Sequence, residues 1–74
     1  MRIRLYCEED FRRSDGIVLC QGGRYYELRK ETHELTWKLI EPSGNPFDED
    51  RVLIEGVSSS AVFDTGCFTE ELPF

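Results

Sequence analysis

The amino-acid sequence predicts one small all-β domain over residues 1–74, folded as a five-stranded barrel or rolled sheet that can include one short helical turn. In several short segments, apolar and polar residues alternate at the two-residue period of a β-strand. Glycine, proline, asparagine and aspartate separate these segments, which is typical of tight turns. Nine aromatic residues supply apolar surface for one modest core, and closure of the sheet would remove its exposed edges.

The first predicted strand covers residues 2–7, where the alternation is strict. Its apolar face carries Ile3, Leu5 and Cys7. Its other face carries Arg2, Arg4 and Tyr6. After a Ser-Asp-Gly turn at residues 14–16, the apolar run Ile-Val-Leu-Cys at residues 17–20 predicts a second, short strand.

A Gln-Gly-Gly turn is expected to lead into a strand over residues 24–30. Tyr26 and Leu28 share one face of this strand, and Tyr25 lies on the opposite face. A helix over residues 25–34 is the alternative for this region, because most of its residues tolerate helical conformation.

The clearest apolar stripe in the sequence follows. Its members alternate along the chain: His33, Leu35, Trp37 and Leu39. We expect Trp37 to form the centre of the core, because it is the largest apolar side chain in the stripe. The Pro-Ser-Gly-Asn-Pro-Phe-Asp-Glu-Asp segment at residues 42–50 then predicts a long loop, since proline cannot pair within a sheet.

Three more segments complete the expected fold. Residues 51–57 predict a strand with Val52 and Ile54 pointing inward. Residues 61–63 (Ala-Val-Phe) predict a fifth strand. The tail, residues 67–74, is expected to form either one helical turn or a last edge strand.

Residues 17–28 (Ile-Val-Leu-Cys-Gln-Gly-Gly-Arg-Tyr-Tyr-Glu-Leu) resemble the second-strand region of small SH3-like β-barrel proteins that are common in phages and prophages. The family pattern Gly-basic-x-Tyr-x-aliphatic is matched by Gly23, Arg24, Tyr26 and Leu28. An aromatic strand ending in an acidic-Gly-Asn turn is matched by Trp37, Glu41, Gly44 and Asn45. The resemblance covers residues 17–45 and implies an SH3-like barrel of phage or prophage type. The proline and three acidic residues that follow Asn45 depart from the pattern.

Charge limits the kinds of partner. The net charge is −6, with seven basic and five acidic residues in positions 1–30 but two basic and ten acidic residues in positions 31–74. This balance argues against direct nucleic-acid binding, which needs a basic surface to neutralise phosphates. It suits a protein partner with a basic surface. No apolar run is long enough to cross a membrane and the first residues do not read as a signal peptide, so a cytoplasmic location is expected.

Candidate partner-binding residues come from two groups. Tyrosine and arginine are frequent interface anchors, which singles out Arg4, Tyr6, Arg24 and Tyr25. The acidic run of the long loop supplies Asp48, Glu49 and Asp50. We therefore predict a non-enzymatic protein-binding module. The phage-type resemblance implies that it would occupy a host protein's surface, for example as an anti-CRISPR or other anti-defence inhibitor of a nucleic-acid-handling complex.

Other functions remain open at this point. In a nucleotide-binding protein, or sponge, Arg24 and Arg29 would hold a phosphate beside an aromatic ring that holds the base. The run Asp64-Thr65-Gly66 resembles the signature of aspartic proteases, in which two such aspartates share a proton and a single one would require a dimer. The simpler interpretation of this run is a turn that closes a strand. We expect no catalytic site.

The three cysteines allow three interpretations. An odd number at irregular spacing does not form a closed disulfide set, so buried, reduced thiols are expected. One alternative is a zinc site built from His33 and all three thiolates, those of Cys7, Cys20 and Cys67. The other is a dyad of His33 with one of these cysteines. No Cys-x-x-Cys pair is present, so no metal and no cofactor are expected.

Overall fold

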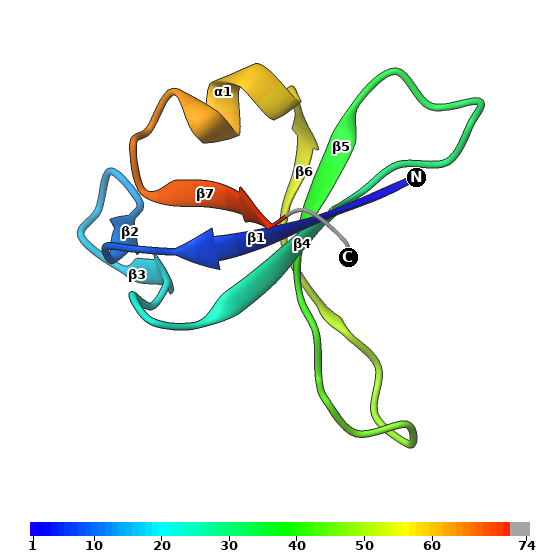
Figure 1. Ribbon diagram of the computed structural model, residues 1–74, viewed down its shortest axis with the longest axis horizontal. Helices are drawn as coiled ribbons and strands as arrows, with labels where there is room; N and C mark the ends of the chain where they lie inside the picture. Colours follow the sequence, from blue (N-terminus) through cyan, green and yellow to red (C-terminus); the bar gives the residue numbers. More distant parts are fainter. Residues whose placement is uncertain (72–74) are drawn as a thin grey trace.

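The computed structural model describes residues 1–71, which form two antiparallel sheets and one short helix (Figure 1). The elements in chain order are β1 (Arg2–Cys7), β2 (Phe11–Arg12), β3 (Val18–Cys20), β4 (Tyr25–Arg29), β5 (Trp37–Glu41), β6 (Arg51–Val57), α1 (Ser59–Phe63) and β7 (Phe68–Glu71). The main sheet has the strand order β6-β5-β4-β1-β7, and β2 pairs only with β3. The all-β prediction is therefore confirmed.

The sheet does not close into a barrel. Strands β6 and β7 form its two edges, and within residues 1–71 no backbone pairing joins them. Helix α1 connects these edge strands and packs over the inner face of the sheet, while β2 and β3 cover the inner face near β1 and β4 (Figure 1). The core is thus covered by separate elements. Of the two expected forms, the closed barrel does not occur in the described residues, and the five main strands form an open sheet with one short helix.

The core lies on the face that the alternation in β1 and β4 predicts. Leu5, Cys7 and Leu28 are fully buried, and Tyr26 is 2% exposed. Antiparallel pairing brings these strands into register, with Ile3 opposite Leu28 and Leu5 opposite Tyr26. Other elements complete the cluster with Cys20, Leu39, Val62 and Phe68. The helix alternative for residues 25–34 is wrong, because β4 occupies Tyr25–Arg29.

Trp37 is not the centre of this core. Strand β5 begins only at Trp37, and the chain before it turns, so the apolar stripe is not one continuous strand. Leu35 lies in that preceding loop and is 95% exposed. Trp37 is partly buried at the margin of the core, with Lys30 Nζ 5.1 Å from its ring centroid.

Residues 61–63 form part of a helix and not the predicted fifth strand. Ser58 is the N-cap of α1, and its side-chain oxygen accepts a hydrogen bond of 3.1 Å from the Ala61 N–H. Serine at this position satisfies a backbone donor that the first helical turn leaves unpaired. The helix directs Val62 into the core, and Phe63 packs against the same core. These two apolar residues therefore belong to a helix and not to a strand.

Irregular pairing of β6 changes which of its residues point inward. Leu39 pairs with Ile54 but Ile40 pairs with Val52, so Leu53 is an extra residue in β6. Val52 is consequently 44% exposed, against the prediction, whereas Ile54 packs against the core. In the tail, the edge-strand alternative is confirmed over Phe68–Glu71, and residues 72–74 lie outside the described part.

Candidate functional site

The outer face of the main sheet, opposite the core, gathers three of the residues singled out from the sequence. Tyr6 and Tyr25 are cross-strand partners, and their ring centroids lie 5.2 Å apart. Arg4 places its guanidinium carbon 4.4 Å from the centre of the Tyr25 ring. The Tyr25 hydroxyl also donates a hydrogen bond of 3.3 Å to Glu71 on β7. Arg4, Tyr6 and Tyr25 therefore form one ordered group, here called the Tyr/Arg cluster.

Arg24 lies outside the Tyr/Arg cluster. Its Nη1 is 3.6 Å from Oε1 of Glu41, and Nη1 of Arg51 is 3.9 Å from the other oxygen of the same carboxylate. Arg24 therefore shares Glu41 with Arg51. The expected grouping of Arg24 with Tyr25 does not occur through any recorded contact among residues 1–71.

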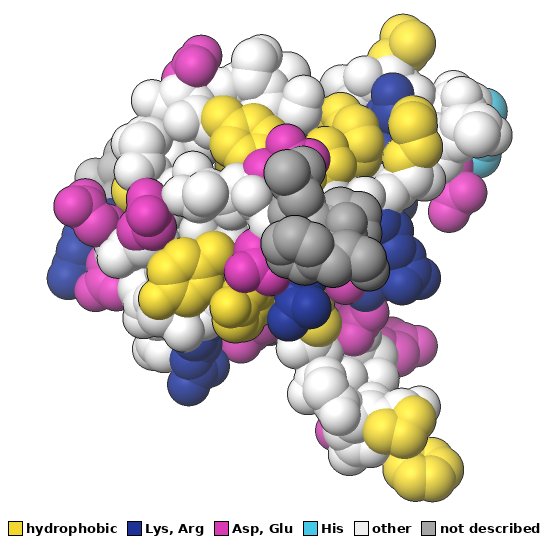
Figure 2. Space-filling view, in the orientation of Figure 1, with side chains coloured by type: hydrophobic (Ala, Val, Ile, Leu, Met, Phe, Trp, Pro, Cys, Tyr) yellow, Lys and Arg dark blue, Asp and Glu magenta, His cyan; other side chains and the backbone are white. Residues whose placement is uncertain are grey.

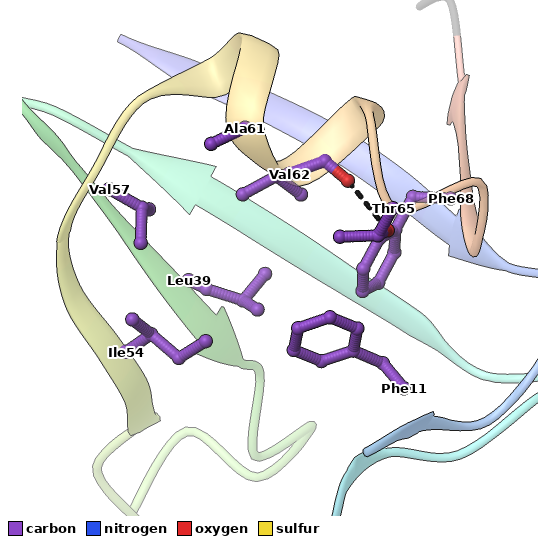
Figure 3. Close-up of a pocket in the computed structure, with 8 residues that line it drawn as sticks. All are labelled: Phe11, Leu39, Ile54, Val57, Ala61, Val62, Thr65 and Phe68. Carbon is purple, nitrogen blue, oxygen red and sulfur yellow. Dashed lines mark hydrogen bonds between the residues drawn. The ribbon is translucent and has the colours of Figure 1, made fainter. Parts of the chain in front are cut away.

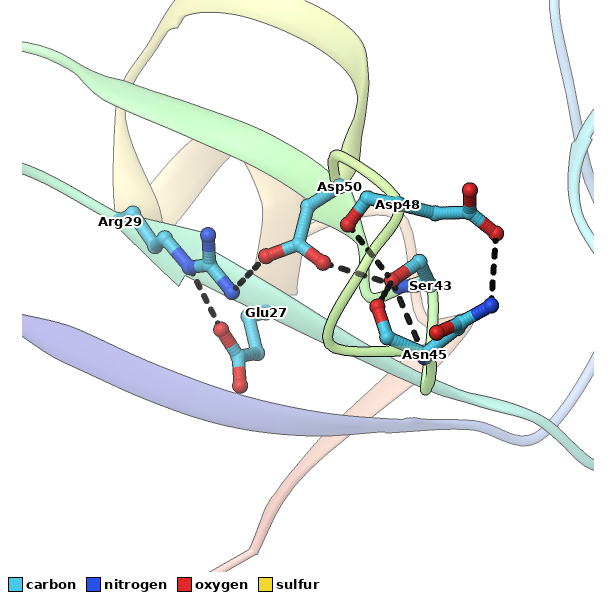
Figure 4. Close-up of polar contacts among 6 residues, drawn as sticks. All are labelled: Glu27, Arg29, Ser43, Asn45, Asp48 and Asp50. Atoms are coloured by element: carbon cyan, nitrogen blue, oxygen red, sulfur yellow. Dashed lines mark hydrogen bonds and ion pairs between the residues drawn. The ribbon is translucent and has the colours of Figure 1, made fainter.

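Arg29 joins the outer face of the sheet to the base of the long β5–β6 loop (Figure 4). Its Nε lies 2.6 Å from Glu27 Oε2, and its Nη2 lies 2.6 Å from Asp50 Oδ2. Partial burial alone would lower the pKa of Arg29, but the hydrogen bonds to Glu27 and Asp50 outweigh it and raise the pKa. The pKa of Asp50 is lowered, first by the Ser43 backbone N–H and then by Arg29.

Internal hydrogen bonds order the β5–β6 loop, residues 42–50 (Figure 4). The Ser43 N–H donates to Asp50 at 2.9 Å, and the Ser43 hydroxyl accepts from the Asn45 N–H at 3.2 Å. The Asn45 side chain donates to Asp48 at 3.1 Å and accepts from the Phe47 N–H at 3.0 Å. Two of the three acidic residues predicted as partner-binding, Asp48 and Asp50, are thus held in defined positions, and Glu49 is exposed beside them.

Phe47 stands at the end of this braced loop with 94% of its surface exposed. Figure 2 shows hydrophobic atoms at the tip of the projecting segment at lower right, where Figure 1 places the β5–β6 loop. Sequence reasoning passed over Phe47 and treated it only as an extension of the loop. The available signal was a phenylalanine between a proline and three acidic residues, outside any alternating segment.

The cysteines and His33 do not form a chemical site. Cys7 and Cys20 are fully buried, which confirms the expectation for these two, and Cys67 is partly buried. Burial is the main cause that raises the pKa of Cys7 and raises that of Cys20 to about 12, so both are neutral, weakly nucleophilic thiols at neutral pH. His33 is exposed in the β4–β5 loop, and within residues 1–71 no three His, Cys, Asp or Glu side chains converge on a metal position.

The Asp64-Thr65-Gly66 run ends helix α1. Asp64 is the C-cap, and its N–H donates to Ser60 O at 2.8 Å. The Thr65 hydroxyl donates to Val62 O at 2.8 Å, and Gly66 adopts a φ of 75°, which suits glycine. The run is a turn, as in the simpler interpretation, although it closes a helix and not a strand.

An apolar pocket of about 170 Å³ opens between α1, β6 and the neighbouring aromatic residues (Figure 3). It is lined by Phe11, Leu39, Ile54, Val57, Ala61, Val62, Thr65 and Phe68. Thr65 is the one polar lining residue, and its hydroxyl is occupied, since it donates to Val62 O and accepts from the Cys67 N–H at 3.2 Å.

The expected phosphate-binding pair is not assembled in the described residues. Arg24 is paired with Glu41, and Arg29 is held between Glu27 and Asp50. Arg29 borders a second depression of about 110 Å³, whose lining has mixed charge: Lys30 and Lys38 line it, and so do Glu31 and Glu34. Neither depression joins Arg24 and Arg29 beside an aromatic ring.

No helix in the described part of the chain is both long enough and apolar enough to cross a membrane. Comparisons with protein-family models, with curated proteins and with solved structures find no match for this chain.

Proposed function

We propose that this chain is a non-enzymatic protein-binding module whose β5–β6 loop docks on a partner protein. The observation that carries the proposal is the 94% exposure of Phe47 on a loop that is already hydrogen-bonded within itself. Burial of an exposed aromatic side chain by a partner contributes about 1.5–3 kcal/mol to the binding free energy. Aromatic side chains seated in a partner's pocket are typical anchors of protein interfaces.

The bracing of the loop supports binding because it reduces the entropy lost on association. Ser43 and Asn45 bridge the two sides of the loop, and Arg29 fixes Asp50 at its base. A loop that is ordered before binding loses less conformational freedom when the complex forms. The Ser43 and Asn45 side chains thereby keep Phe47 in position for docking.

Charge favours a partner with a basic surface. Asp48 and Glu49 directly follow Phe47 on the exposed loop, and the whole chain carries a net charge of −6. Attraction between an acidic loop and a basic surface speeds association and weakens as salt screens it. The Tyr/Arg cluster on the sheet supplies a second contact region with the residue types that interfaces favour.

The phage-type resemblance of residues 17–45 suggests the class of partner. We propose a host protein that handles nucleic acids, such as a CRISPR or other defence effector, because such proteins expose basic surfaces to bind phosphates. Occupation of that surface by the loop would block access of the nucleic acid. In this proposal the module acts as an inhibitor.

An affinity capture from nuclease-treated bacterial lysate tests the proposal. The wild type, Phe47→Ser and the matched control Leu35→Ser would be compared, because Leu35 is equally exposed but lies on the other loop. We expect the wild type and the control to retain one protein even after the nuclease treatment, and Phe47→Ser to lose it. Rising salt should elute this protein. Equal retention by Phe47→Ser would contradict the role of the loop.

A further inference from the structure

The same chain carries an exposed aromatic side chain and an apolar pocket of matching size. Phe47 is 94% exposed, and the pocket beside α1 measures about 170 Å³. A cavity of about 150 Å³ lined by leucine, isoleucine and phenylalanine is large enough for benzene. The pocket can therefore hold one phenyl ring.

The chemistry of the pocket matches a phenyl ring as well. Seven of its eight lining residues are apolar, and no charged side chain lines it. The hydroxyl of Thr65 is occupied by hydrogen bonds within its own turn, so a ligand without polar atoms leaves no partner unsatisfied. Polar ligands would gain no hydrogen bond from these side chains.

We propose that, in the free protein, Phe47 of one copy enters the apolar pocket of a second copy. Each copy presents Phe47 and this pocket within residues 1–71, so two reciprocal contacts can close a dimer. This inference rests on the proposed function, because it adds a regulation of the same loop. Self-association hides Phe47, and a partner must compete with the second copy to bind it.

The buried area makes this a weak, reversible dimer. One aromatic side chain buries about 150–250 Å², so two reciprocal contacts and their pocket walls together bury roughly 600–1,000 Å². Stable, specific interfaces bury about 1,200–2,000 Å². A contact below that range dissociates readily, as release to a partner requires.

Salt separates self-association from partner binding. Two copies that each carry −6 repel one another, and salt screens this repulsion. Self-association is therefore expected to strengthen as salt rises. Binding of the acidic loop to a basic partner is expected to weaken under the same conditions.

The first test measures the mass of the wild-type protein by sedimentation across a wide range of concentrations and salt. We expect a concentration-dependent mass above the 8.7 kDa of one chain, larger at high salt. Phe47→Ser should remain monomeric, and Leu35→Ser should associate as the wild type does. A monomeric wild type under all conditions, or an associating Phe47→Ser, would overturn the proposal.

A second test uses Ala61→Leu, which puts a larger side chain into the pocket from an exposed helical position. Leucine has high helix propensity, and thermal unfolding would confirm that the variant folds. Ala61→Leu should be monomeric yet still capture the partner, because it keeps Phe47. Loss of partner capture by Ala61→Leu would count against the proposed function, because this variant keeps Phe47. Retained self-association would instead overturn the proposed role of the pocket.

Mixing the two variants completes the test. Isotope-labelled Phe47→Ser retains an intact pocket, and unlabelled Ala61→Leu supplies Phe47. We expect NMR signals of pocket residues such as Ile54 and Val62 to shift on mixing, and not to shift when unlabelled Phe47→Ser is added. Identical spectra in both mixtures would overturn the proposal even if the wild type associates by another surface.

Discussion

Arg29 Nη2 lies 2.6 Å from Asp50 Oδ2. This side chain of β4, on the outer face of the sheet, is thus bound to the base of the loop that presents Phe47. The same arginine contacts Glu27 on its own strand, which holds the guanidinium in place. The ordered sheet is thereby coupled to an exposed aromatic side chain through one ion pair. The orientation of the loop depends on this contact as well as on its internal hydrogen bonds.

This ion pair predicts a definite pH dependence. The pKa of Asp50 is lowered from 3.8 by the Ser43 N–H and by Arg29, so its contribution to stability is fully present above 3.8 and is lost as the pH falls through the lowered value. Asp50→Asn should therefore be less stable than the wild type at neutral pH. The difference should disappear in acid, below the lowered pKa. Thermal unfolding of both proteins as a function of pH checks this, and a constant difference across the range would contradict it.

Two leucines with opposite environments test the position of the core. Leu28 is fully buried between the sheet and its covering elements, and Leu35 is 95% exposed. Leu28→Ala should lower the free energy of unfolding by about 2–5 kcal/mol, because it leaves a cavity. Leu35→Ala should change it by no more than about 0.5 kcal/mol. Urea unfolding of the two variants measures both values, and similar losses would refute the assigned core.

The short helix depends on its N-cap. Ser58→Ala removes the side-chain acceptor of the Ala61 N–H, and it should destabilise the protein by about 1 kcal/mol. In a domain of this size, that loss lowers the melting temperature by roughly 4–8 °C. Ser60→Ala is the matched control. Within residues 1–71 the Ser60 hydroxyl has one hydrogen-bond partner, the Ser58 hydroxyl at 3.3 Å, and it does not bond to the helix backbone. Equal melting temperatures for the two variants would argue against the cap.

The cysteines should differ in reactivity. Cys7 and Cys20 are fully buried with raised pKa values, so a thiol reagent should leave both unmodified in the folded protein at neutral pH. Cys67 is partly buried and should react first. Mass spectrometry after brief labelling measures the modified sites, with the unfolded protein as the control in which all three react. Early modification of Cys20 would contradict the fold around β3.

The sequence predicted β1 and β4, in which the alternation is regular, and also the full span of β6, residues 51–57. In β1 and β4, Leu5 and Leu28 face the core as their spacing indicates. It did not predict β2, because two residues, Phe11 and Arg12, show no period. Helix α1 was misread as a strand since its apolar residues are few, although Ser58 three positions before Ala61 is a usable capping signal.

The candidate site was only partly predictable. The outward position of Tyr6 and Tyr25 follows from the faces assigned to β1 and β4, but their pairing depends on a register that the faces do not give. The contact between Arg29 and Asp50 does not follow from spacing, because Arg29 ends β4 and Asp50 ends the β5–β6 loop, far apart in the sequence. Exposure of Phe47 was equally hidden, since an apolar residue in a loop can fold back onto the core and only the completed fold shows that it does not.

The most direct test of the central claim is an NMR titration of the isotope-labelled protein with the partner retained in the affinity capture. The account predicts that signals of residues 43–50 show the largest changes, that amides of the Tyr/Arg cluster shift less, and that Phe47→Ser abolishes both. Large changes confined to another surface, with the β5–β6 loop unaffected, would show that the loop is not the docking element and would contradict the account.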